Sequence, residues 1–133
     1  GEYKLAERNR GLLLAQDLMA EILQQAYADP NDPIAFGPEP GEGSSNRTDF
    51  DDVDDYHEWA KSAPQRKDGS TIPDLGGWGR SVAVIWVNPA NLSQTVGSDQ
   101  GVKRVTVTVT HNGLPVSSMA AFRTSAWPDL ANE

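Results

Sequence analysis

The first part of the chain carries apolar residues at three- and four-residue spacings. No Pro occurs between residues 3 and 28, and Gly11 is the only Gly there. Such spacings place side chains along one side of an α-helix, so the pattern predicts one amphipathic helix over about residues 2–27. The periodic apolar positions are Leu5, Leu12, Ala15, Met19, Ile22 and Ala26.

The predicted helix begins without a capping residue. Ser, Thr, Asp or Asn usually precedes a helix and satisfies its free backbone N–H groups, whereas this chain begins Gly1-Glu2-Tyr3-Lys4. We therefore interpret the segment as the lower half of a longer helix whose upstream part is missing.

Additional leucines widen the apolar arc of this helix beyond what one sheet covers. We expect part of the arc to contact a second molecule, with charged residues near the helix start selecting the neighbour. The candidates for this interface are Leu13, Leu14, Leu18, Leu23, Arg8 and Arg10.

A long irregular connection is predicted between the helix and the next regular structure, over about residues 28–80. Pro30 and Pro33 end helical structure, and residues 37–45 are too poor in apolar side chains to fold alone. Val53, Tyr56 and either Trp59 or Ala60 share a side of a short helical turn, so we expect the aromatic residues there to pin the connection to the domain.

The last third of the chain reads as antiparallel sheet over about residues 81–124. Residues 81–87 are rich in β-branched and aromatic residues, and residues 102–110 alternate Val with Thr. Asn112-Gly113 is the favoured pair for a two-residue type I′ hairpin, which predicts that residues 116–124 return as the partner strand. Residues 89–101 read as a polar loop and residues 125–133 as a tail.

These elements predict a single α+β domain over residues 1–133. The helix has an apolar stripe and the sheet has an apolar face, and both are removed from water when the two pack together. We expect a long N-terminal helix on a C-terminal antiparallel sheet of three to four strands.

The charge of the chain is strongly acidic and unevenly distributed. The formal net charge is −8, and residues 29–58 contain ten acidic residues against one basic residue, Arg47. Nucleic acid repels negative charge, so we expect no nucleic-acid partner. No stretch approaches the ~20 apolar residues that span a bilayer.

The residues that carry catalysis in enzymes form no recognisable arrangement in this sequence. The chain has no Cys, and its two His residues, His57 and His111, match no metal-ligand spacing. No nucleophile motif or phosphate-binding loop is present. We expect a protein that is not an enzyme, with no catalytic residues and no cofactor.

The acidic segment offers one alternative chemistry. Carboxylates at Asp51, Asp54 and Asp55 are hard oxygen ligands of the kind that Ca²⁺ prefers, although their spacing misses the calcium-loop pattern. The competing interpretation is that these acids are solvated or complement a helix dipole. If calcium binds, the chain would be a calcium-dependent extracellular module that contacts a glycan or a protein through Tyr56 and Trp59.

Three stretches of the sequence resemble type IV pilins and pseudopilins, most closely minor pilins of the mannose-sensitive haemagglutinin type. The helix, the acidic block and the strand before the Asn-Gly turn carry this resemblance. They are Asn9 to Leu23, Asn46 to Tyr56 and Val102 to Val109.

The resemblance implies a pilin-like fold and a non-enzymatic structural subunit of a type IV pilus or of a type II secretion-like filament. It also implies other pilin or pseudopilin subunits as partners and assembly through the N-terminal helix. A missing N-terminal segment would anchor the subunit in the bacterial inner membrane, facing the periplasm, before it enters a filament or reaches the cell surface. The absence of Cys departs from pilins that close their terminal loop with a disulfide.

Overall fold

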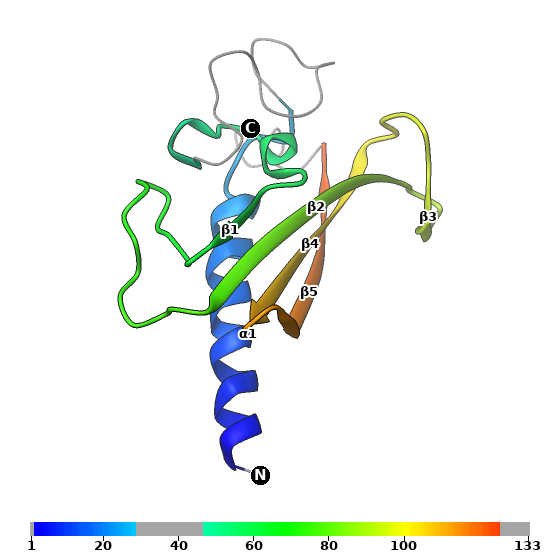
Figure 1. Cartoon of the computed structure of the whole chain (residues 1–133). Helices are drawn as coiled ribbons and strands as arrows, with labels where there is room; N and C mark the ends of the chain where they lie inside the picture. The colour runs from blue at the N-terminus through cyan, green and yellow to red at the C-terminus, as the bar shows by residue number, and fades with distance from the viewer. Residues whose placement is uncertain (1, 29–46, 126–133) are drawn as a thin grey trace.

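The computed structural model describes residues 2–28 and 47–125, and within these ranges it contains one α-helix and five strands (Figure 1). The helix α1 spans Glu2–Leu23. The strands are β1 (Ala60–Ser62), β2 (Trp78–Asn88), β3 (Asn91–Thr95), β4 (Val102–His111) and β5 (Leu114–Thr124). Two short 3-10 helices, η1 (Arg47–Asp49) and η2 (Val53–Tyr56), lie between α1 and β1.

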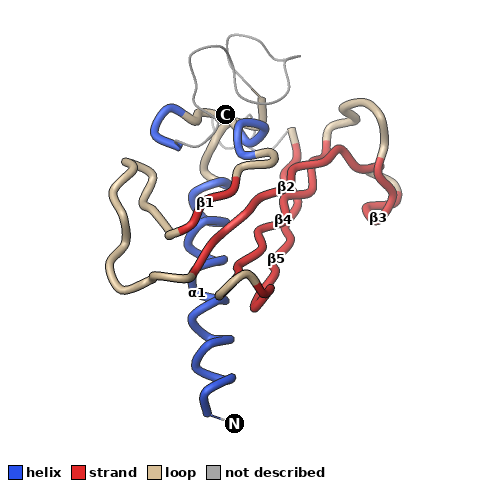
Figure 2. Tube along the Cα trace, viewed as in Figure 1, coloured by secondary structure: helices blue, strands red, loops and turns tan. Residues whose placement is uncertain are grey.

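The strands form an antiparallel sheet in the order β1-β2-β4-β5, with β3 paired to the far end of β2. Helix α1 lies against one face of the sheet and contacts β4 and β5 (Figure 2). The first turns of α1 extend past the end of the sheet (Figure 1). One face of the sheet and one side of the helix are therefore covered by each other.

The predicted fold class is wrong in the composition of the sheet, which has five strands instead of three to four. β1 forms within the connection that we predicted as irregular, and β3 forms within the predicted polar loop over residues 89–101. Neither strand has an apolar alternation, because each is held by backbone pairing to an edge of β2 instead of by a buried face.

The helix also ends earlier than the predicted residue 27. After Leu23 the chain leaves the helix, and Ala26 forms a parallel bridge with Asp52. The Val53 N–H donates to the Ala26 carbonyl at 2.9 Å. The backbone that would have continued the helix therefore binds the acidic segment instead. The residues predicted as an exposed loop over 37–45 and as part of the tail over 126–133 lie outside the described residues.

The core lies between α1 and the sheet and is closed at one end by the segment around η2. Its valine rows come from β2 and β4, where Val82 pairs with Val107 and Val84 with Val105. The predicted anchors Val53, Tyr56 and Trp59 are all buried in it, which confirms that they pin the connection to the domain. The members from α1 are Leu14, Ala15, Leu18, Met19 and Ile22.

Two local features set how the helix and sheet meet. The β4–β5 turn has positive φ at both Asn112 and Gly113, as the Asn-Gly pair predicts. Gly11 is the point at which α1 closes on β5, because a Cβ there would lie 3.0 Å from Val116 Cγ1. Residues of α1 before Gly11 run beyond this contact.

Candidate functional site

The exposed side of α1 carries three large apolar side chains. Leu13 is 66% exposed, Leu5 is 59% exposed and Leu12 is 40% exposed. Exposed leucines that cluster on one element are a feature of surfaces that bind other proteins. Arg8 and Arg10 are also exposed on the same helix. We call Leu5, Leu12 and Leu13 with Arg8 and Arg10 the assembly surface.

The structure divides the six interface candidates named from the sequence. Leu13, Arg8 and Arg10 lie at the surface, as the prediction requires. Leu14 and Leu18 do not, because they point toward the sheet and belong to the core. Leu23 is half-buried and packs against the core. Leu14 and Leu18 are therefore corrected from interface to core residues, and Leu23 is largely a core contact.

From the sequence we predicted that Leu5 and Leu12 belong to the apolar stripe that packs on the sheet. In the structure both are exposed and belong to the assembly surface. Leu5 lies in the first turns of α1, which extend past the end of the sheet (Figure 1). Leu12 follows Gly11 but is also exposed. The spacing of apolar residues predicts which of them share one side of a helix. It does not predict where the sheet that packs against that side ends.

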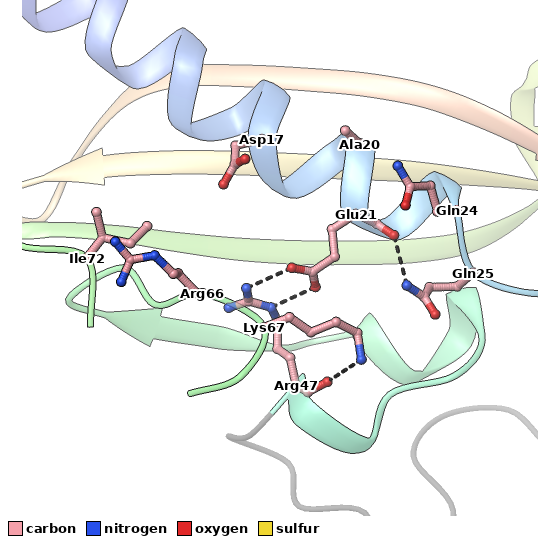
Figure 3. Close-up of a pocket in the computed structure, with 9 residues that line it drawn as sticks. All are labelled: Asp17, Ala20, Glu21, Gln24, Gln25, Arg47, Arg66, Lys67 and Ile72. Carbon is pink, nitrogen blue, oxygen red and sulfur yellow. Dashed lines mark hydrogen bonds and ion pairs between the residues drawn. The ribbon is translucent and has the colours of Figure 1, made fainter. Parts of the chain in front are cut away.

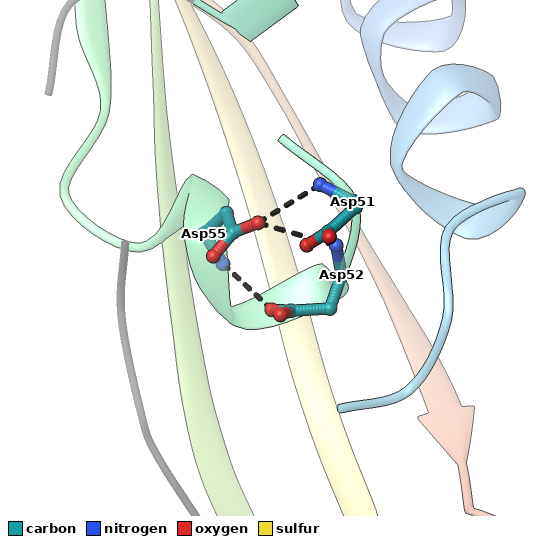
Figure 4. Close-up of side chains that lie close together, drawn as sticks. All are labelled: Asp51, Asp52 and Asp55. Atoms are coloured by element: carbon teal, nitrogen blue, oxygen red, sulfur yellow. Dashed lines mark hydrogen bonds between the residues drawn. The ribbon is translucent and has the colours of Figure 1, made fainter. Parts of the chain in front are cut away.

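The acidic segment folds as a capped turn at the C-terminal end of α1 (Figure 4). The Asp55 backbone N–H donates to the Asp52 carboxylate at 3.1 Å, and the Asp52 N–H donates to the Asp55 carboxylate at 3.2 Å. The Asp51 N–H also donates to the Asp55 carboxylate at 2.9 Å. This is a capping box, in which two carboxylates satisfy the free N–H groups of η2.

Burial changes the protonation of this turn. Asp52 is fully buried, and burial together with the nearby charges of Asp55 and Asp54 raises the pKa of Asp52 to about 8. The carboxyl group is held largely neutral near pH 7, because a buried charge without a cationic partner is costly. The capped turn therefore favours a protonated Asp52.

Asp54 takes no part in these capping hydrogen bonds and pairs with a buried cation on β4. Its carboxylate lies 2.6 Å from Lys103 Nζ, and both side chains are almost completely buried. Burial raises the pKa of Asp54, and Lys103 opposes that rise. Lys103 also donates to the Tyr27 carbonyl and lies 3.8 Å from the centre of the Tyr27 ring. One lysine thus joins the helix end, η2 and the sheet.

The structure does not bring together the calcium candidates Asp51, Asp54 and Asp55 as one set. Asp51 and Asp55 lie near Asp52, with carboxylate atoms of these three within 4.8 Å of one another, while Asp54 is bound to Lys103. Asp52 and Asp55 accept the capping hydrogen bonds described above. Nothing in this arrangement favours a calcium-dependent module over a capped structural turn.

A second charged group fixes the other side of the connection to α1 (Figure 3). Arg47 donates from Nε and Nη2 to the two oxygens of Glu21, at 2.8 and 2.9 Å. The Tyr56 hydroxyl donates to the same carboxylate at 2.8 Å. Arg47 is 2% exposed and stacks over Trp59 at 4.8 Å. We call the Glu21–Arg47 and Asp54–Lys103 pairs, with their tyrosines, the ionic clamp.

Beside Glu21 a cavity of about 500 Å³ lies between α1 and residues 66–72. Lys67 lines it, but its ammonium group already donates to the carbonyls of Arg47, Thr48 and Phe50 at 2.9–3.1 Å. Lys67 is therefore engaged in holding the backbone around η1.

Both histidines make structural contacts that the sequence did not predict. His57 Nδ1 accepts a hydrogen bond from the Val84 N–H at 3.0 Å. His111 stacks on Trp78, with ring centres 4.2 Å apart, and its Nδ1 lies 2.6 Å from the Glu7 carboxylate. A histidine beside a hairpin turn gives no local signal of such a contact, since its partner lies 104 residues away.

Comparison of the chain with protein-family models, with curated proteins and with solved structures finds no match in any of the three. Within the described ranges, no helix combines the length and the apolar character needed to cross a membrane.

Proposed function

We propose that the protein is a non-enzymatic structural subunit, a minor pilin or pseudopilin, of a type IV pilus or a type II secretion-like filament. Other subunits of the same kind are its partners, and α1 is the element through which it assembles. The proposal places the subunit at the bacterial inner membrane before assembly and in the filament or at the cell surface afterwards.

The observation that carries this proposal is the assembly surface. Leu5, Leu12 and Leu13 are 40–66% exposed to water, while other leucines of the same helix are packed in the core. Burying their apolar surface against a neighbouring subunit would stabilise the complex by about 25 cal/mol per Å² buried. The ionic clamp supports the same function, because it fixes the far end of α1 so that the surface is presented in one orientation.

Charge supplies selectivity in this proposal. Arg8 and Arg10 are exposed basic residues in a chain of net charge −8, and exposed acids such as Asp49 and Asp51 lie near the opposite end of α1. Pairing of these arginines with the acidic segment of a neighbour would fix which subunit is accepted.

The test uses the absence of Cys from the natural sequence. Leu13→Cys in the full-length protein should form cross-links to neighbouring filament subunits, whereas the exposed β5 control Ser118→Cys should not. Leu13→Asp should lower filament incorporation at least about tenfold with an unchanged melting temperature, and Ser118→Asp should leave incorporation unchanged. Arg8→Glu with Arg10→Glu should weaken incorporation. Equal cross-linking from positions 13 and 118, or normal incorporation of the Asp and Glu variants, would reject the proposal.

A further inference from the structure

We propose that the cavity beside Glu21 binds an oxyanion, a phosphate or a carboxylate, between the guanidinium groups of Arg47 and Arg66 (Figure 3). Its volume of about 500 Å³ accommodates a group of this size. On α1 the cavity begins at Asp17, after the last residue of the assembly surface. The inference goes beyond the proposed function and does not depend on it, because the cavity lies within a single copy of the chain.

One wall of the cavity carries a guanidinium group with an unused donor. Arg47 is 2% exposed, and its Nε and Nη2 donate to the Glu21 carboxylate. Nη2 also donates to the Gln65 carbonyl at 2.9 Å. Nη1 points away from that carboxylate (Figure 3), is buried and has no hydrogen-bond partner among the described residues. A buried donor without a partner is costly, and an oxyanion bound beside Arg47 would remove this cost.

The carboxylates that line the cavity are already paired with arginines. Glu21 forms the ion pair described above, and Asp17 Oδ2 lies 3.7 Å from Nη1 of the buried Arg80. Arg66 and Lys67 add two further cations to the lining. Neither of them forms an ion pair with a carboxylate in the part of the chain that the structure describes. The cavity therefore keeps an excess of positive charge in a chain whose net charge is −8.

Arg66 is the exposed half of the site. Its Nη1 donates to the Ser70 hydroxyl at 3.3 Å. The neighbouring Asp68 carboxylate accepts from the N–H and the hydroxyl of Ser70, at 2.8 and 2.6 Å. A guanidinium group has five N–H donors in a planar fork that matches the oxygens of a carboxylate or a phosphate. Arg66 therefore has donors left for the oxyanion that Arg47 Nη1 would contact.

A second buried arginine strengthens the positive field behind this wall. Arg80 Nη2 donates at 2.6 Å to the Gln65 carbonyl, which also accepts from Arg47. Burial, together with the charge of Arg47, lowers the pKa of Arg80 to about 10, so both groups are cations near pH 7. Two cations held on one carbonyl repel each other, and a bound anion would offset that repulsion.

Two sources of oxyanion share this chemistry. One is inorganic phosphate in solution. The other is a carboxylate of a second copy of the chain, whose acidic segment exposes Asp49 and Asp51. Either source supplies the paired oxygens that a guanidinium group binds.

Nuclear magnetic resonance of the 133-residue chain at pH 7 tests the site. Sodium phosphate, exchanged against sodium chloride at constant ionic strength, should shift the Nε–Hε signals of Arg47 and Arg66 along a saturable curve. Arg66→Gln should raise the Kd for phosphate about tenfold, because charged donors are lost, and should leave the melting temperature without phosphate unchanged. The control Arg104→Gln removes a half-exposed arginine of β4 and should leave the Kd unchanged.

The same signals, followed without phosphate, report the second source. Shifts that grow with protein concentration and disappear in Asp49→Asn with Asp51→Asn identify a carboxylate of a second copy, whereas shifts with phosphate alone identify a free oxyanion. The site is overturned if chloride reproduces the shifts, if Arg66→Gln binds phosphate as tightly as the natural sequence, or if neither source shifts the signals. Filament incorporation of Leu13→Asp is measured separately, so the assembly role of α1 and the oxyanion site can fail independently.

Discussion

The two halves of α1 belong to one continuous helix but differ in how much of their surface the rest of the domain covers. The half after Gly11 faces the sheet with Leu14, Leu18 and Ile22, each less than 10% exposed. The half before Gly11 extends beyond the sheet and reaches the hairpin through Glu7. The comparison shows that helical periodicity specifies a face, while the length of the sheet decides how much of that face becomes core.

The difference extends to the charged residues. Near the C-terminal end of α1, the cations Arg47 and Lys103 are almost completely buried and paired with carboxylates. Near the N-terminal end of α1, by contrast, Arg8 and Arg10 are exposed. Buried pairs contribute little net stability when intact, but they are costly to break. The C-terminal end of α1 is therefore fixed in one arrangement, whereas the arginines near its N-terminal end stay exposed at the surface.

The largest expected effect comes from breaking the ionic clamp. Lys103→Met leaves Asp54 buried without its cation, so it should lower the free energy of unfolding by about 3–5 kcal/mol. Urea denaturation measures this loss, and Lys61→Met on β1, where the lysine is half-exposed, is the control. Adding Asp54→Leu to Lys103→Met should restore most of the stability. A loss below about 1 kcal/mol would mean that the clamp does not hold the helix end.

A matched pair of leucines on the helix sharpens the comparison further. Leu18 is fully buried, so Leu18→Ala should cost about 2–5 kcal/mol of unfolding free energy. Leu13 is 66% exposed, so Leu13→Ala should lower the free energy of unfolding by no more than about 0.5 kcal/mol. Thermal or urea unfolding compares the two variants. Similar losses at both positions would show that Leu13 is a core residue and that the assembly surface is misassigned.

The smallest effect concerns the protonation of the capped turn. The pKa of Asp52 is about 8 in the folded protein and near 4 in an unfolded chain, so the folded state binds more protons between these values. Its contribution to stability is present at low pH and is lost as the pH rises toward 8. Asp52→Asn should flatten the fall in stability between pH 5 and 7 by about 1 kcal/mol per pH unit.

Urea denaturation at pH 5, 6 and 7 measures that slope, with Asp68→Asn at an exposed turn as the control. A slope in Asp52→Asn equal to that of the natural sequence would show that Asp52 is not the group that takes up the proton.

Elements whose signal lies within a few neighbouring residues were predicted well from the sequence. The alternating Val and Thr of β4 and the Asn112-Gly113 turn fix a strand and its return through local backbone preferences. The same holds for the anchors Val53, Tyr56 and Trp59, which are apolar residues in a polar segment. The strands β1 and β3 were not predicted from the sequence, because each depends on backbone pairing with β2.

The burial of Leu14 and Leu18 and the separation of Asp54 from the other two calcium candidates have a related reason. Leu14 and Leu18 differ from Leu13 only by their angle around α1, and that angle has meaning only once the sheet lies against one side. Asp54 differs from Asp51 and Asp55 because Lys103, which is 49 residues further along the chain, comes close to it in the fold. Neither distinction is present in a local spacing.

The sequence by itself determined the helix, the Val-Thr strand with its hairpin, the acidic excess and the aromatic anchors, because each depends on backbone preference or polarity over a short range. Only the tertiary structure decided where α1 leaves the sheet, which leucines become core, which acids cap η2 and which one pairs with Lys103. Those outcomes depend on contacts between distant segments, whose energies exist only after the chain has closed on itself.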